Sequence, residues 1–161
     1  MPWLITILVC GAAIGIGAAI GIKRGKKIKE LQNEGTVVRR STRYAEKGEE
    51  FTSKIGSYAA WKDQLLAANI PCAMKGNAGS EIVFTSKNYS ARLYKNAFDE
   101  TSGIGVYRFE FTHWQTSGYT YVDEVYMNTL LTSVENAFLK LDPNTAVRSY
   151  DVDFNVKHKV F

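Results

Sequence analysis

Cys72, His113 and His158 are the thiol and imidazole side chains that follow residue 50. A cysteine and a histidine perform nucleophilic catalysis when they lie within hydrogen-bond reach and a third group orients the imidazole. Here Cys72 directly follows a proline, and both histidines lie among apolar neighbours in alternating segments, a pattern typical of a buried thiol and two sheet residues. The sequence therefore predicts no catalytic residue and a protein that is not an enzyme. One alternative stays open, an enzyme whose site forms only in three dimensions around Cys72 or a histidine.

Metal and phosphate sites have recognisable spacings that this chain lacks. It contains no C-x-x-C and no H-E-x-x-H, the spacings that place zinc ligands together. Asp151 and Asp153 fall on one side of an alternating strand, where both side chains face solvent. Gly103-Ile104-Gly105 lacks a third glycine, because Arg108 occupies that position, and it precedes a strand instead of a helix. We predict neither a metal nor a cofactor.

Four aromatic residues cluster around the turn at Ser117-Gly118, namely Trp114, Tyr119, Tyr121 and Tyr126. Tryptophan and tyrosine are enriched at the centres of protein interfaces. Trp114, Tyr119 and Tyr121 are therefore a possible partner surface. The alternative is that the cluster packs in the core and at the start of a helix.

The first part of the chain is apolar. Trp3–Ile22 contains no charged residue, and the sequence GAAIGI occurs twice in succession over Gly11–Ile22. A helix of 20 residues is about 30 Å long, which matches the hydrocarbon core of a bilayer. No basic residue precedes this segment, as one would in a cleaved signal peptide. We predict an uncleaved transmembrane helix over residues 3–22. A cleaved signal, or a core or interfacial helix, is the alternative.

Glycines repeat at helical spacing within the predicted span. Gly11 and Gly15 form one small-xxx-small pair, and Gly17 and Gly21 form another. Such pairs allow two helix backbones to approach closely in lipid. They predict a protein partner, or a homo-oligomer formed through the transmembrane helix. A plain anchor is the alternative.

Charge is unevenly distributed after the span. Residues 23–47 carry nine basic and three acidic side chains, whereas residues 48–161 carry eleven basic and thirteen acidic ones. Positive charge next to a span is retained on the cytoplasmic side. We therefore predict that the N-terminus lies outside and the domain in the cytoplasm, at a bacterial inner membrane, a plasma membrane or an organelle equivalent.

The slightly acidic charge of the domain argues against nucleic acid as a partner. The neck either binds anionic membrane lipids or only sets the orientation; its basic residues are Lys23, Arg24, Lys26, Lys27 and Lys29.

Periodicity assigns three regions: the span at residues 3–22, a basic neck or linker at 23–50, and an α+β domain at 51–161. Apolar spacing predicts one helix from Phe51 to about Leu66 and a second over Val122–Leu141. Short or alternating apolar runs predict strands at Cys72–Lys75, Glu81–Ser86, Tyr89–Lys95, Gly105–Trp114 and Tyr150–Val160. The expected domain is a mainly antiparallel sheet of four to five strands with two helices on one face.

We therefore expect a non-enzymatic, single-pass accessory or assembly protein. It would contact partners through its small-residue span and its cytoplasmic domain. A second class stays open, a membrane-tethered binder of a small apolar ligand or lipid in a pocket between sheet and helices. No motif in the chain resembles that of a known family.

Overall fold

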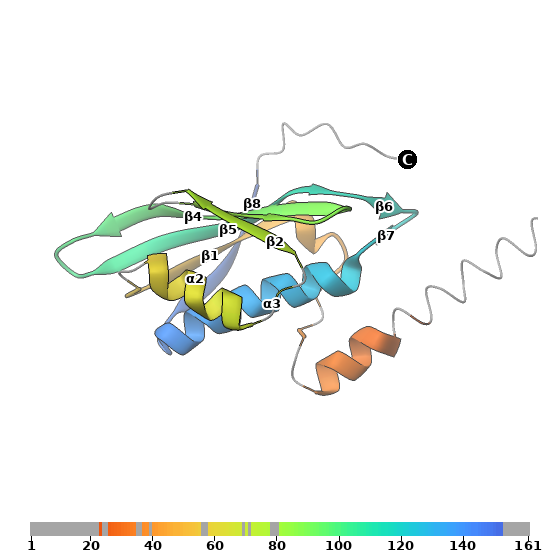
Figure 1. Cartoon of the computed structure of the whole chain (residues 1–161), viewed down its shortest axis with the longest axis horizontal. Helices are drawn as coiled ribbons and strands as arrows, with labels where there is room; N and C mark the ends of the chain where they lie inside the picture. The colour runs from red at the N-terminus through yellow and green to blue at the C-terminus, as the bar shows by residue number, and fades with distance from the viewer. Residues whose placement is uncertain are drawn as a thin grey trace, which may run out of the picture. The chain divides into compact units, whose positions relative to one another are not determined.

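Antiparallel pairing joins six strands of the chain into one sheet. In this computed structural model, residues 23, 26–34, 37–38, 40–55, 58–68, 70, 72–77 and 81–152 are described. The sheet has the order β2-β3-β4-β5-β1-β8, and all its neighbouring strands are antiparallel (Figure 1). Its strands are β1 (Lys47–Ser53), β2 (Ala73–Asn77), β3 (Glu81–Thr85), β4 (Tyr89–Asp99), β5 (Ile104–Trp114) and β8 (Ala146–Asp151).

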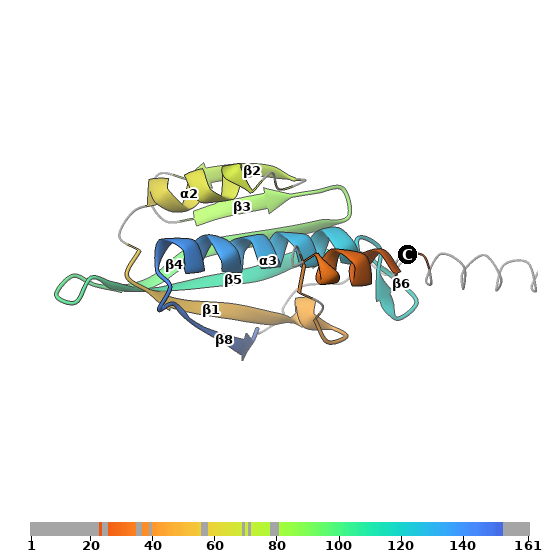
Figure 2. The same ribbon diagram turned by 90° about the horizontal axis from the view of Figure 1, so that it is seen from below.

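Two helices cover one face of this sheet. They are α2 (Tyr58–Ala67) and α3 (Glu124–Leu141), and both views place them on the same side (Figures 1 and 2). A short hairpin of β6 (Thr116–Ser117) and β7 (Thr120–Tyr121) leads from β5 into α3, and a 3-10 turn, η1 (Tyr44–Glu46), precedes β1. The predicted α+β class and the predominantly antiparallel sheet are confirmed.

Aromatic packing between the sheet and the helices forms the core. The ring of Phe138 on α3 stacks on Phe51 of β1, with centroids 4.3 Å apart and planes at 2°. Trp61 of α2 meets Tyr107 of β5 edge-on at 4.4 Å and Phe138 at 5.3 Å. These side chains are buried. Two of the contacts attach the helices to β1 and β5, and the third joins the helices to each other.

Alternation explains why β5 faces two environments. Tyr107, Phe109 and Phe111 are buried toward the helices, while Arg108 lies on the other face, as a period of two requires. The predicted strand Gly105–Trp114 is confirmed, and β5 begins one residue earlier than predicted. The predicted helix Val122–Leu141 is also confirmed, and α3 begins two residues later than predicted. Helix α3 ends at Leu141. The carboxylate of the next residue, Asp142, accepts hydrogen bonds from the Lys54 backbone N–H at 2.9 Å and from Ser53 Oγ at 3.1 Å.

The start of the domain differs from the prediction. The compact unit begins at Arg40 instead of residue 51, and Phe51 belongs to strand β1 instead of a helix. The spacing of Phe51, Ile55 and Tyr58 resembles a helical stripe, but the first two belong to β1 and the loop after it, and α2 begins only at Tyr58. Strand β1 lies between β5 and β8, and the pairing it gains on both sides outweighs local propensity. With β1 included, the sheet has six strands instead of the predicted four or five.

The last strand is also displaced from its predicted position. Strand β8 begins at Ala146 and ends at Asp151, whereas the prediction began at Tyr150. Residues 153–161, which complete the predicted strand, lie outside the described residues.

Residues 1–39 form a separate unit. Within it, residues 26–33 are helical, and Lys23, Lys26, Lys27 and Lys29 are exposed. The predicted span at residues 3–22, its four glycines and Arg24 lie outside the described residues. No helix in the described part of the chain combines the length and the apolar character of a membrane span.

Candidate functional site

The sheet face opposite the helices carries a polar cluster. No described helix or strand covers this face (Figure 1), and its side chains come from β8, β1, β5 and β4. We call the set the arginine–tyrosine cluster and the surface the open face. The cluster consists of Glu50, Arg92, Tyr94, Arg108, Glu110, Arg148 and Tyr150.

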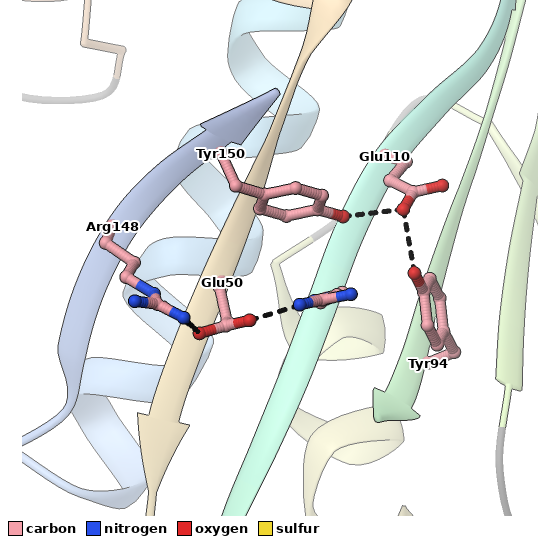
Figure 3. Close-up of polar contacts among 6 residues, drawn as sticks. Glu50, Tyr94, Glu110, Arg148 and Tyr150 are labelled. Carbon is pink, nitrogen blue, oxygen red and sulfur yellow. Dashed lines mark hydrogen bonds and ion pairs between the residues drawn. The ribbon is translucent and has the colours of Figure 1, made fainter. Parts of the chain in front are cut away.

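Glu50 lies between two arginines on neighbouring strands. The register pairs it with Arg108 of β5 on one side and Arg148 of β8 on the other. Arg108 Nε donates to Glu50 Oε2 at 2.9 Å, and Arg148 Nε donates to Oε1 at 2.6 Å (Figure 3). Because each carboxylate oxygen accepts from a different strand, Glu50 holds three strands in register through charge-assisted hydrogen bonds.

Glu110 is the second centre of the cluster. The hydroxyls of Tyr94 and Tyr150 donate to its Oε1 at 2.7 and 2.6 Å, as Figure 3 shows. Arg92, its register partner on β4, donates from Nε at 3.1 Å and Nη2 at 2.9 Å to Oε2. Tyr150 reaches Glu110 from β8 by lying across β1, over Gly48.

Two guanidinium groups lie over aromatic rings. The Cζ atom of Arg108 is 4.7 Å from the ring centroid of Tyr150, and that of Arg92 is 4.8 Å from that of Tyr94. Each arginine is thus held both by a carboxylate and by a ring face. The orientation of Arg92 and Arg108 is therefore set before any ligand arrives.

Burial separates the charges by depth. The side chains of Glu50 and Glu110 are 4% and 7% exposed, whereas those of Arg148, Arg92 and Arg108 are 72%, 44% and 31% exposed. Burial acts to raise the pKa of both carboxyls, but the hydrogen bonds from arginine and tyrosine outweigh it, and each pKa lies below its ordinary value. The anions therefore stay ionised beneath the sheet surface, and the cations face outward.

The tyrosines of the cluster do not act as bases. Burial and the hydrogen bond to Glu110 raise the pKa of Tyr150 and of Tyr94 above the ordinary value. Both phenols stay protonated at neutral pH and act only as donors to Glu110. The two glutamates already accept several hydrogen bonds each, and the arginines that bind them face outward. This arrangement suits the binding of an anion better than the transfer of a proton.

A second ionic cluster lies on the helix side of the sheet. Arg40 donates from Nη1 to Glu49 on β1 at 3.0 Å and from Nη2 to Glu135 on α3 at 2.6 Å. Burial, reinforced by the negative charge of Glu135, raises the pKa of Glu49, although Arg40 opposes the shift. This cluster ties the first residue of the compact unit to β1 and α3, and its role is structural.

The predicted aromatic surface is divided between the core and the solvent. Trp114 and Tyr121 are buried, whereas Tyr119, at the tip of the β6–β7 hairpin, is 99% exposed. The ring of Tyr121 packs against Tyr44 at 5.1 Å, and its hydroxyl accepts from the Ala45 N–H at 3.3 Å. The three side chains do not form one exposed patch, because Trp114 and Tyr121 attach η1 and the hairpin to the core.

No hydrogen bond joins the candidate nucleophile Cys72 to His113 in the part of the chain that the structure describes. Cys72 is half-buried, and burial raises the pKa of its thiol to about 11. His113 is half-buried on β5, opposite Ser90, and His158 lies outside the described residues. Asp151 forms an ion pair with Lys47 at 3.2 Å. In the described ranges, no three histidine, cysteine or acidic side chains gather as metal ligands would.

A shallow pocket of about 410 Å³ opens where β1, β8 and the end of α3 meet. Its lining includes Ser53, Lys54 and Asp142, and the Asp142 carboxylate already accepts hydrogen bonds from the other two residues. The space between sheet and helices is filled by the aromatic core, which gives the apolar-pocket alternative no support. This pocket carries no functional argument.

Sequence reasoning missed the open face. Arg108 and Glu110 occupy alternate positions of the predicted strand Gly105–Trp114, but polar residues on one side of a strand indicate only a solvated face. The sequence feature that could have indicated the cluster is the mixture of arginine, glutamate and tyrosine at outward positions of several strands. Only the strand order, which brings β8 beside β1, reveals that these positions meet. No protein-family model, curated protein sequence or solved structure matches the chain.

Proposed function

We propose that the chain is a non-enzymatic, membrane-anchored accessory or assembly protein that binds a partner protein through the open face of its α+β domain. The observation that carries this proposal is the separation of charge in the arginine–tyrosine cluster. Three guanidinium groups face outward above two buried carboxylates. No geometry in the described residues supports a reaction at this surface, whereas it offers several oriented donors.

The composition of the open face favours protein recognition. Tyrosine and arginine are the side chains that most often dominate binding energy at interfaces. Here Arg92 and Arg108 are stacked on Tyr94 and Tyr150, so little side-chain entropy remains to be lost on binding. Such pre-organisation increases affinity for a given contact area.

The anchor rests on the sequence of the first 29 residues. Twenty uncharged residues followed by a basic neck suit a single span with the domain on the cytoplasmic side. The pairs Gly11/Gly15 and Gly17/Gly21 offer a second contact, with a partner's span or with another copy of this chain. Lys23 to Lys29 would lie near anionic headgroups.

Photo-cross-linking in intact cells tests the proposal. A photoreactive amino acid replaces Thr52, two residues from Glu50 on the open face, or Val83, which the register places opposite Arg92. Matched controls carry it at Leu66 on α2 or Leu139 on α3, which are both exposed on the helical side. We expect positions 52 and 83 to cross-link to one defined protein.

The control positions decide the interpretation. Cross-links confined to Leu66 and Leu139 would place the partner on the helices and refute the open face. If none of the four positions yields a defined product, the accessory role itself fails. Fractionation of the same cells should find the chain in membranes, and its loss from them on deletion of residues 3–22 tests the anchor separately.

A further inference from the structure

We propose that the ligand of the open face is an acidic segment of a partner polypeptide, a short stretch rich in aspartate and glutamate. This inference rests on the proposed function and names the chemistry of its partner. The reasons are the charge that the face presents, the donors it offers and the distance between its arginines.

The face presents positive charge although its formal charges nearly balance. Glu50 and Glu110 are buried beneath the side chains that bind them, while Arg148 and Arg92 are 72% and 44% exposed. The register adds Lys75 and Glu81 to the same face, and their charges offset each other. An approaching ligand therefore meets guanidinium groups before it meets any carboxylate of the cluster.

Donors remain for a ligand after the internal bonds are made. Arg148 and Arg92 use Nε and Nη2 to bind the glutamates. In the described structure neither glutamate takes a bond from Nη1 of either arginine. Carboxylates are the usual partners of a planar guanidinium, so each Nη1 is a place for an incoming side-chain carboxylate.

The spacing of the arginines fits an extended peptide. Arg148 on β8 and Arg92 on β4 are three strands apart in the order β8-β1-β5-β4 and staggered by two residues along the strands. At about 4.8 Å per strand and about 3.4 Å per residue, the distance is about 16 Å. An extended chain covers that distance in about four or five residues. One short acidic segment can thus reach all three arginines while crossing the strands.

A lipid surface fits this face less well. Binding at a bilayer surface combines basic residues with apolar side chains that enter the headgroup region. The exposed large apolar side chains in the described domain lie on other surfaces, such as Leu66 on α2, Leu139 on α3 and Tyr119 at the hairpin tip. The open face offers charge and hydrogen bonds without an apolar wedge, which favours a polypeptide.

The test measures binding of fluorescein-labelled hexaglutamate to the full-length chain in a non-ionic detergent, by fluorescence anisotropy at low salt. We expect saturable binding that hexaglutamine does not show. R148Q and R92Q should each weaken it about fivefold, the effect expected for loss of one exposed charge-assisted contact. In R148Q, Arg108 still pairs with Glu50, and an unchanged thermal midpoint shows that the fold is kept.

The matched control is R43Q. Arg43 is 74% exposed and pairs with Glu46 at 2.7 Å, but it precedes η1 and lies outside the cluster. It should bind hexaglutamate within twofold of the wild type. Equal losses in R43Q and R148Q would show charge attraction without a site and overturn the proposal.

Two further outcomes would also overturn it. Hexaglutamate binding that R148Q and R92Q leave intact, but that K26Q/K27Q abolishes, would assign the peptide to the neck. Arg148-dependent binding to vesicles containing phosphatidylserine, without binding to hexaglutamate, would assign the face to lipid. If cross-links from Thr52 and Val83 to a protein persist while hexaglutamate does not bind, only the acidic class of partner fails, and the proposed function stands.

Discussion

The ring of Tyr150 lies directly over Gly48, its register partner on the neighbouring strand. A Cβ atom on Gly48 would overlap this ring. The missing side chain is what allows Tyr150 to pass over β1 and donate to Glu110 on β5 at 2.6 Å. A glycine inside a strand lowers stability when nothing covers it. Here an aromatic ring from the next strand covers it, as in aromatic rescue of sheet glycines.

Replacing Gly48 with alanine should therefore destabilise the domain. The new methyl group displaces the Tyr150 ring and breaks its hydrogen bond to Glu110. We expect the free energy of unfolding to fall by about 1–2 kcal/mol, since overpacking costs about 1–3 kcal/mol and the lost flexibility of glycine returns about 0.5–1 kcal/mol. Urea denaturation of the full-length chain in detergent measures the change.

A double-mutant cycle with Y150A provides the control. Once the ring is removed, G48A should be neutral or slightly stabilising, because only the flexibility of glycine is then lost. Additive effects of G48A and Y150A would show that the two residues do not interact and would contradict the contact.

Acid should weaken the arginine–tyrosine cluster. The pKa values of Glu50 and Glu110 are depressed in the folded state, so their contribution to stability is present above the ordinary value near 4.5 and is lost as the pH falls through the folded value. E110Q should lower the free energy of unfolding by about 2 kcal/mol at pH 7, and by clearly less at pH 3.5. Urea denaturation at the two values checks this, with E100Q in the exposed β4–β5 turn as the control. An E110Q effect of equal size at both values would refute it.

The elements that local pattern predicts well are those whose two sides differ most. Strand β5 alternates between Phe109 and Phe111 toward the core and Arg108 toward the open face, and α3 repeats its apolar stripe over five turns. Strand β1, with the sequence KGEEFTS, shows no such contrast. Glu49 and Glu50 look solvated in sequence, but both are buried in the structure. Arg40 binds Glu49, and Arg108 and Arg148, from distant parts of the chain, bind Glu50.

The candidate site depends on the same non-local information. Arg148 and Glu50 are 98 residues apart, and Arg108 and Glu50 are 58 apart. Their meeting requires β1 to insert between β5 and β8, and strand order is set by the packing of the whole sheet instead of by any one segment. The aromatic residues near Ser117 do not share one exposed surface, for a related reason. Burial of Trp114 and Tyr121 depends on η1, which the sequence assigned to the linker.

Alkaline conditions should weaken the helix-side cluster, the opposite of the open face. The pKa of Glu49 is raised by burial and by Glu135, so the stability it contributes is fully present below the ordinary value and is lost as the pH rises through the folded value. Wild-type stability should fall between pH 5 and pH 8.5. E49Q keeps an acceptor for Arg40 and stays neutral at every pH. It should therefore reduce this fall by at least about 1.4 kcal/mol, which corresponds to a shift of one pKa unit. Thermal unfolding across that range measures it, and an unchanged slope in E49Q would contradict the assignment.

Truncating the two tyrosines of the β6–β7 hairpin, Tyr119 and Tyr121, should affect stability differently. Y121A removes a buried ring that contacts Tyr44 and Trp114, with centroids 5.1 and 6.3 Å away. It should lower the free energy of unfolding by about 3 kcal/mol, as aromatic core truncations do. Y119A removes a ring that is 99% exposed and should change stability by less than about 0.5 kcal/mol. Chemical denaturation of both variants gives the comparison. If Y119A keeps full stability but yields less of the cross-linked partner, the partner's footprint reaches the hairpin tip; if the yield is unchanged, the contact stays on the open face.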